Sequence, residues 1–219
     1  MSRHAGFLLF ALPIAFVALA CGGGSSSSGS DLTVGALFDL SGPGQSLGQL
    51  SLSAAQLAAE EATQRGVSIS IEVRDTQSNP QIAVEQLNDL LASGISIVLG
   101  PQTSSEASAV LPIANTAGAL LVSQGSTASS LAIAGDALYR LVPTDRVESR
   151  AVYDLALLGR NDGFVTVNRD DTGNAGLVSS FTGYAAVGGD PVQPAITYPA
   201  SQTTGFGELC SQIAASVSS

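Results

Sequence analysis

The sequence predicts an α/β protein with parallel sheets in two lobes, and two observations support this prediction. From residue 32 onward, short apolar segments of strand character alternate with longer segments of helical periodicity. Strands separated by helices of this length form a parallel sheet that is covered on both faces. The alternation stops at an apolar segment near Val142 and Pro143 and then begins again, which predicts two lobes.

The first run of the alternation contains local signals for its elements. Residues 67–75 alternate apolar and polar side chains with period two, as a strand does. Asn79 suits a helix N-cap, Pro80 suits a first helical turn, and Gly94 suits a helix end. The expected strands are 32–40, 67–75, 95–100 and 119–123, and the expected helices are 50–66, with Ala54, Leu57, Ala58 and Ala62 on one face, 79–94 and 104–118.

The second run follows "LYRLVP" at 138–143 and offers only two clear strands before the sequence ends at Ser219. A two-stranded sheet has exposed edges and little core, so the second lobe is expected to be incomplete. We expect a first lobe over 31–142 and a partial second lobe over 143–219, with helices at 145–159, 175–187 and 204–217 and strands at 163–168 and 192–198.

The N-terminal residues predict export and a membrane anchor. Arg3 and His4 precede the apolar run "AGFLLFALPIAFVALA", which is typical of a signal peptide over residues 1–20. "ALAC" resembles a lipobox, with Ala18 where that motif usually has leucine, and this predicts lipidation at Cys21. The Gly/Ser stretch within 21–30 is typical of a flexible linker. The alternative is an ordinary cleaved signal in which Cys21 has no role.

The charge and the missing residue types exclude several functions. Removal of residues 1–20 takes the net charge from −10 to −11, because one arginine and no acid is lost. Such a surface disfavours nucleic acids, which bind basic patches. The chain has no lysine, its only histidine is His4, and Cys210 is the only cysteine besides Cys21. We therefore expect no catalytic residues, no metal site and no cofactor, and predict that the protein is not an enzyme.

Ligands of parallel α/β sheets bind outside the carboxyl ends of the strands, so the loops that follow the strands are the candidate binding segments. Gly42, Gly44 and Gly48 suggest a dinucleotide fingerprint, with Asp75 as the ribose-binding acid. The spacing is one residue too long, however, and the loop begins several residues after the strand. We therefore interpret these glycines as turn residues.

Two serine-rich loops follow neighbouring strands and predict an anion site. Ser104 and Ser105 begin a helix after one strand, and they suit either an N-cap or a site for an anion such as a carboxylate. "SQGSTASSL" at 123–131 follows the next strand and contains Ser126 and Thr127. Because both loops lie at the same edge of one sheet, we expect them to converge on one crevice.

Several stretches together resemble a known family. "VGALFDLSGPGQSLGQ", "RDTQSNPQIAVEQLNDLLASGISIVLGPQTSSEASAVLPIANTAGALLVSQGSTASSL", "YRLVPTD" and "RDDTGNAG" occur in an order similar to that of type I periplasmic binding proteins. The nearest group is the leucine/isoleucine/valine-binding (branched-chain amino acid or amide) receptors of ABC importers. The resemblance covers residues 32 to 217 and implies two Rossmann-like lobes that close on a small ligand. Family members continue well beyond this point, so the resemblance also implies a truncated chain.

The resemblance implies roles for particular residues. Ser104 and Thr127 would hold the α-carboxylate of the ligand, and the carbonyl of Gly125 with the Thr127 hydroxyl would meet its α-ammonium. Ser126 lies in the same turn, and Leu47 would line the cleft near the ligand side chain. Thr172 stands where many members have an aromatic residue, so it marks an altered contact from the second lobe.

The function that follows is an extracytoplasmic, lipid-anchored solute-binding protein that delivers an amino acid or amide-like ligand to an ABC permease. Two alternatives are a sensory or regulatory ligand-binding module of the same fold and a Rossmann-like enzyme that uses Asp39, Asp75, Asp170 or Asp171. The ligand class stays open among branched-chain amino acids, other amino acids, small amides and aromatic acids.

Overall fold

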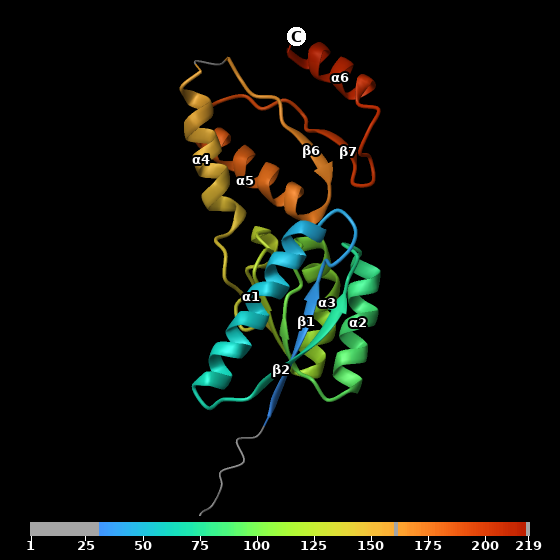
Figure 1. Ribbon diagram of the computed structural model, residues 1–219. Helices are drawn as coiled ribbons and strands as arrows, with labels where there is room; N and C mark the ends of the chain where they lie inside the picture. The colour runs from blue at the N-terminus through green and yellow to red at the C-terminus, as the bar shows by residue number, and fades with distance from the viewer. Residues whose placement is uncertain (1–30, 160–161, 218–219) are drawn as a thin grey trace, which may run out of the picture.

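The computed structural model describes residues 31–159 and 162–217, so the predicted signal peptide and Cys21 lie outside the described residues. Figure 1 shows two lobes stacked end to end, with the N-terminal elements in one lobe and the C-terminal elements in the other. In the described part of the chain, no helix is both long and apolar enough to span a lipid bilayer.

The first lobe is built on a five-stranded sheet with the strand order β2-β1-β3-β4-β5. Every neighbouring pair in this sheet is parallel, as the alternation of strands and helices predicts. Because the strands are parallel, their carboxyl ends share one edge of the sheet, and in Figure 1 this edge faces the second lobe. The strands are β1 (Leu32–Phe38), β2 (Ile69–Asp75), β3 (Ile97–Leu99), β4 (Leu120–Ser123) and β5 (Leu138–Arg140).

Three helices cover this sheet: α1 (Gln45–Gln64), α2 (Pro80–Ala92) and α3 (Ser104–Ala117). Helices α2 and α3 pack against each other on one face of the sheet, and α1 lies on the other (Figure 1). Asn79 caps α2 with its side chain and Pro80 is the first residue of that helix, as expected. The core between sheet and helices is a single cluster of small and branched apolar side chains: Leu37, Ala83, Leu87, Leu90, Ile95, Val98, Ala107, Val110, Leu111, Ala114, Ala119, Leu121, Ala128, Leu131 and Leu138.

The second lobe is smaller, with a parallel two-stranded sheet formed by β6 and β7. Helices α4 and α5 pack against each other, and the buried cluster between them consists of Tyr153, Phe181 and Ala185. Helix α6 has no buried residue. The elements are α4 (Asp145–Leu157), β6 (Val167–Asp170), α5 (Thr172–Gly188), β7 (Ile196–Pro199) and α6 (Gly207–Val217).

The inward face of α1 differs from the expected one. Ala54, Leu57 and Ala58, which the periodicity placed on one apolar face, are all exposed, and Leu57 is 57% exposed. Gly48 is the buried residue of the helix, and the half-buried positions are Ser51, Leu52, Ala55, Ala59 and Ala62, so only Ala62 of the expected face is turned inward. A Cβ at Gly48 would lie 2.0 Å from the backbone oxygen of Asp39, so the close approach of α1 to the end of β1 requires glycine here and sets which face of the helix points inward.

Several boundaries also differ from the sequence prediction. Helix α1 starts at Gln45 instead of residue 50, and α5 starts at Thr172 instead of residue 175. Strand β6 begins at Val167 rather than at 163, although Phe164 forms an isolated bridge with Val192. The segment 138–140, which the sequence suggested only as a junction, pairs with β4 as the fifth strand. The start of α5 is set locally by the Asp171 cap, whereas the fifth strand depends on pairing with a distant segment.

Candidate functional site

The candidate site lies where the carboxyl ends of β3 and β4 face the second lobe. Thr103 caps α3, and its hydroxyl accepts a hydrogen bond from the backbone N–H of Glu106 at 3.3 Å. The Glu106 carboxylate in turn accepts from the Thr103 N–H, at 3.0 Å. This capping box makes Ser104 the first residue of the helix, which corrects the interpretation of Ser104 or Ser105 as the N-cap.

The structure brings Ser104 and the loop after β4 together. The Ser104 hydroxyl oxygen accepts hydrogen bonds from the backbone N–H groups of Thr127 and Ala128, at 3.2 and 3.1 Å. The Ser126 hydroxyl lies 3.4 Å from the same oxygen. Ser104 and Ser126 are both buried, whereas Thr127 is half-buried. Because the Ser104 oxygen accepts these bonds, its own proton is available for an acceptor such as a carboxylate.

Hydrogen bonds and one close backbone approach fix the conformation of the loop after β4. The buried Ser123 hydroxyl donates to the carbonyl of Pro101 at 2.6 Å and accepts from the N–H of Ser126 at 3.0 Å. A Cβ at Gly125 would lie 2.6 Å from the carbonyl oxygen of Gln102, so this position requires glycine. Gly125, Ser126 and Thr127 therefore form one rigid turn beside Ser104.

The second lobe contributes the N-terminus of α5 to the same place. The backbone N–H of Thr172 donates to the Ser105 hydroxyl at 3.2 Å. A Cβ at Gly173 would lie 3.6 Å from the Ser104 hydroxyl oxygen, which places this turn of α5 directly against α3. The N-termini of α3 and α5 thus meet across the junction of the two lobes. The positive ends of both helix dipoles favour an anion there.

Leu47, the remaining predicted contact, is in the first turn of α1 and 63% exposed. Its role beside the ligand side chain stays a prediction. The predicted residues Ser104, Gly125, Ser126, Thr127 and Thr172 lie together, and their roles toward a ligand remain predictions.

Sequence reasoning missed two groups at this junction. The first is the pair Gly173 and Gly176, which lie on one face of α5 and let the helix approach closely. The two glycines are three residues apart and follow the cap residue Asp171, so the sequence alone already places them on one face of a helix. The second is Asp145, the first residue of α4, which is completely buried. No signal in the sequence distinguishes this acid from an ordinary residue of a first helical turn.

The glycine-rich loop after β1 serves to pack α1 closely. Gly42 has a left-handed backbone with φ of 78°, and a Cβ at Gly44 would lie 2.0 Å from the Asp39 carboxylate. The Ser78 hydroxyl accepts from the Gly44 N–H at 2.8 Å and donates to Asp39 at 2.8 Å. These contacts agree with the interpretation of the glycines as turn residues and give no support to a dinucleotide fingerprint.

Two of the carboxylates named in the enzyme alternative, Asp39 and Asp75, hold segments of the first lobe together. Asp39 is completely buried and accepts from Thr76 at 2.7 Å. The Asp75 carboxylate accepts hydrogen bonds from the backbone N–H groups of Leu40 and Gln77 and from the Ser41 hydroxyl. Burial alone would raise the pKa of Asp75, but these hydrogen bonds hold it below its usual value.

Asp171 caps α5 and accepts from the backbone N–H of Asn174 at 2.8 Å. Burial alone would raise its pKa. The hydrogen bonds from Asn174 and Arg169 outweigh burial, so the pKa of Asp171 lies below its usual value. Asp171 thus has a structural role as a helix cap, and Asp170 is an exposed residue of β6.

Glu106 differs from these acids because its pKa is high. Burial raises the pKa of Glu106 to about 7, and the negative charge of Asp39 adds to the rise, against hydrogen bonds from Thr76 and Thr103. Over residues 31–159 and 162–217, no group of three or more His, Cys, Asp and Glu side chains is arranged to hold a metal ion. Cys210 is a free and exposed thiol.

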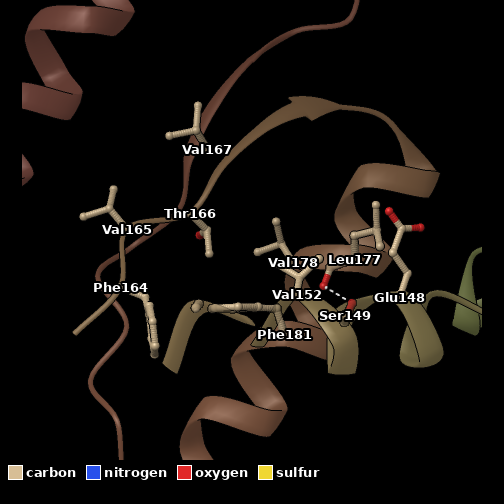
Figure 2. A pocket seen from close by; sticks show the side chains of 11 residues that line it. Glu148, Ser149, Val152, Phe164, Val165, Thr166, Val167, Leu177, Val178 and Phe181 are labelled. Atoms are coloured by element: carbon tan, nitrogen blue, oxygen red, sulfur yellow. Dashed lines mark hydrogen bonds between the residues drawn. The ribbon is translucent and has the colours of Figure 1, made fainter. Parts of the chain in front are cut away.

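A cavity of about 380 Å³ lies in the second lobe, away from the carboxyl ends of β3 and β4. Figure 2 shows apolar side chains around it, including Val152 of α4, Phe181 of α5 and Val165 before β6. Ser149 lies at its rim and donates to the carbonyl of Leu177 at 2.9 Å. The cavity therefore belongs to the small core of the second lobe, and the polar groups of the candidate site lie outside it.

A family model described as periplasmic binding protein matches residues 31–218. Among curated proteins, the Leu/Ile/Val-binding protein BraC3 of Rhizobium johnstonii is 30% identical over 106 residues, which cover 47% of this chain and 29% of that protein. The chain thus spans less than half the length of this relative.

Solved structures share the fold. The leucine binding protein LivK of Thermotoga maritima matches with a TM-score of 0.76 and 20% identity, over 85% of this chain and 54% of that chain. LivJ of Streptococcus pneumoniae, a branched-chain amino acid transporter substrate binding protein solved with isoleucine, matches with a TM-score of 0.69 and 23% identity, over 84% and 54%. The two-stranded sheet of the second lobe fits a chain that spans about half the length of these structures. The chain belongs to the periplasmic binding protein family.

Proposed function

We propose that this chain acts as the extracytoplasmic solute-binding component of an ABC importer, which captures a small amino acid or amide-like ligand as its two lobes close. The observation that supports this proposal is the meeting of Ser104, the turn at Gly125–Thr127 and the N-terminus of α5 at one point between the lobes. Hydroxyl and backbone N–H donors at two helix N-termini are suited to a carboxylate.

The same contacts suggest how closure depends on the ligand. Ser104 and Thr127 belong to the first lobe, whereas Thr172 belongs to the second, so a carboxylate among them would contact both lobes at once. A ligand shifts an equilibrium toward the state with which it makes more favourable contacts. A carboxylate bound by both helix N-termini therefore favours the closed state, and the process requires no covalent step.

The relatives suggest the first ligands to test. BraC3 is a Leu/Ile/Val-binding protein, and LivJ was solved with isoleucine. Leucine, isoleucine and valine combine an α-carboxylate with an apolar side chain. At position 172 this chain has threonine where the resemblance leads us to expect an aromatic residue, so the panel also includes the other amino acids and simple amides.

The test is isothermal titration calorimetry of the chain with this panel, first on the wild type and then on a double variant. We expect Ser104→Ala with Thr127→Val to abolish binding, because both hydroxyl donors to the carboxylate are removed. Thr127→Val alone should weaken binding about tenfold, the cost of one hydrogen bond to a charged group.

Ser130→Ala is the matched control, since Ser130 is an exposed residue of the 3-10 turn Ser129–Leu131 that follows the same loop. It should leave affinity unchanged. Ser104 accepts two backbone hydrogen bonds, so thermal unfolding must show that the double variant is folded. Unchanged affinity in a folded double variant would exclude the carboxylate site.

The anchor and the partner complete the proposal. We place Cys21 at the outer face of a membrane as a lipidated residue, and we propose an ABC permease as the protein that receives the ligand. Their support is the apolar segment before Cys21, the Gly/Ser linker after it and the family of the chain.

A further inference from the structure

One half of the first-lobe sheet lacks a helix on the face that α1 occupies. Helix α1 contacts β1 and β2, whereas α2 and α3 pack on the opposite face (Figure 1). In the described part of the chain, no helix is packed on β3, β4 and β5 from the α1 side. Parallel sheets are normally buried on both faces, so this half of the sheet is an exception.

The register of the strands shows which side chains are uncovered. Val98, Leu121 and Leu138 lie in one row across β3, β4 and β5, and they belong to the buried core with α2 and α3. Successive residues of a strand point to opposite faces, so the residues next to these three point to the α1 side. We call these residues the bare sheet face; four are half-buried and the last is 64% exposed: Ile97, Leu99, Leu120, Val122 and Tyr139.

Helix α1 exposes an apolar stripe. Leu50 and Leu57 are 67% and 57% exposed, and Ala54 between them is exposed as well. Their spacing of four and three residues places them on one side of the helix. No charged residue occurs over 40–59, in a chain with a formal net charge of −10. An exposed apolar face of this kind indicates a contact surface.

We propose that a second copy of this chain covers the bare sheet face with its own α1, so that the protein forms a two-fold symmetric dimer through the first lobes. Each copy has a sheet face that lacks a helix and a helix stripe that lacks a sheet. A surface with both features is complementary to itself, as a two-fold interface requires. Each α1 then lies between the two sheets, on β1 and β2 of its own copy and against β3–β5 of the other.

The charge distribution favours this surface as the contact between two copies. Two chains with a net charge of −10 repel each other over most of their surfaces. The bare sheet face and residues 40–59 contain no charged side chain, so the repulsion is weakest when the copies meet there. The central parts of protein interfaces are likewise depleted in charged residues.

The symmetry of this dimer agrees with the proposed membrane anchor. A two-fold axis parallel to the strands brings each α1 over the bare sheet face of the other copy, and both copies then point the same way. Strand β1 begins at the end of the first lobe away from the second lobe (Figure 1). Both N-terminal linkers therefore leave the dimer at one end, toward the same membrane.

The test is sedimentation velocity of the full chain over a wide range of concentration. Leu50→Glu with Leu57→Glu adds two carboxylates to the stripe at exposed positions. Gln49→Glu with Gln56→Glu is the matched control, because it adds the same charges at the same spacing to exposed positions on another side of α1. Tyr139→Glu changes the sheet side of the contact.

We expect a dimeric wild type. Leu50→Glu with Leu57→Glu should raise the dissociation constant of the dimer by about a hundredfold or more, because carboxylates would be buried without partners. Tyr139→Glu should weaken the dimer too, and the glutamine control should behave as the wild type does. Thermal unfolding checks that each variant is folded.

Photo-cross-linking tests the contact without adding a charge. A benzophenone side chain in place of Leu50 should give a product with the mass of two chains, joined at β4 or β5 of the second copy. Peptide mass spectrometry identifies the joined segment.

Three outcomes would overturn the inference. A wild type that stays monomeric at every concentration shows that a second copy does not cover this face. A dimer that persists in the folded leucine variant and in Tyr139→Glu shows that the copies meet elsewhere. An equal loss in the glutamine control shows that added charge decides association wherever it lies on α1. The proposed solute binding at Ser104 stands or fails independently of all three.

Discussion

Single residues in the first lobe combine helix capping with charge burial, and Glu106 shows this most clearly. Its carboxylate completes the capping box with Thr103, which orients α3 and so presents Ser104. The same carboxylate is completely buried near Asp39, and its pKa rises to about 7, with burial as the main cause. The group that positions the candidate site is thus also one that titrates near neutral pH.

This raised pKa predicts a pH dependence of stability. The folded protein binds the Glu106 proton more tightly than the unfolded chain, whose reference pKa is 4.5. The stabilising contribution is therefore full below pH 4.5 and is lost as the pH rises through about 7. Glu106→Gln keeps an acceptor for the capping box and removes the titration. We expect the variant to be more stable than the wild type at pH 8, by an amount on the order of a few kcal/mol.

The measurement is chemical denaturation between pH 5 and 8, a window that lies above ordinary carboxylate pKa values. Asp75 and Asp171 stay ionised in this window, because the pKa of each lies below 3.8. Glu85→Gln, on the exposed side of α2, is the control and should retain the wild-type slope. The same slope in wild type and Glu106→Gln would contradict this assignment.

At the scale of elements, the contact between α5 and the first lobe depends on the glycines of one helix face. Gly176 approaches the Asp145 carboxylate so closely that a methyl group would overlap it, at 2.1 Å. Gly183 lies on the same helix, and a Cβ there would meet nothing within 4 Å. Substitutions at these two positions therefore distinguish the effect of α5 packing from the effect of helix propensity.

We predict opposite effects for the two substitutions. Gly183→Ala should stabilise α5 by about 0.5–1 kcal/mol, since alanine is the better helix former. Gly176→Ala gains the same propensity, but its methyl group would overlap the Asp145 carboxylate of α4 and contact Ala128 of the first lobe, so α5 should shift away from both. Hydrogen exchange of the Thr172 amide and small-angle scattering measure this shift. An equally compact Gly176→Ala would show that α5 accommodates the methyl group without moving.

The two lobes of the molecule have hydrophobic cores of unequal size. The first has one continuous core beneath a five-stranded sheet, whereas the buried cluster of the second is Tyr153, Phe181 and Ala185 beside a two-stranded sheet. In the described residues, one segment, between β5 and α4, crosses from one lobe to the other (Figure 1). A single crossing constrains the relative position of the lobes less than several would, so their arrangement relies on the contacts of α5 with Ser104 and Ser105.

The predicted anchor also belongs to this scale. Strand β1 begins at the end of the first lobe that lies away from the second lobe (Figure 1). We expect Cys21→Ser to move the protein from the membrane fraction to the soluble fraction and to abolish palmitate labelling. Ser28→Ala in the linker is the control. Labelling that persists in Cys21→Ser would remove Cys21 as the lipidation site.

Much of this protein can be predicted from local sequence. The alternation of strands and helices, the cap at Asn79 and the convergence of the loops at Ser104 and Thr127 follow from periodicity and from the geometry of parallel sheets. These features depend on residues close in the chain, or on a rule that holds for every parallel α/β sheet. The sequence by itself therefore determined the fold class and the place of the candidate site.

Only the tertiary structure decided how distant segments meet. It set the inward face of α1 through the approach of Gly48 to Asp39, and it made 138–140 a fifth strand by pairing with β4. It also left Asp145 buried and unpaired between Ala128 and Gly176. Burial and pairing depend on contacts between segments far apart in the chain, and no local pattern in the sequence indicates which acid these contacts bury.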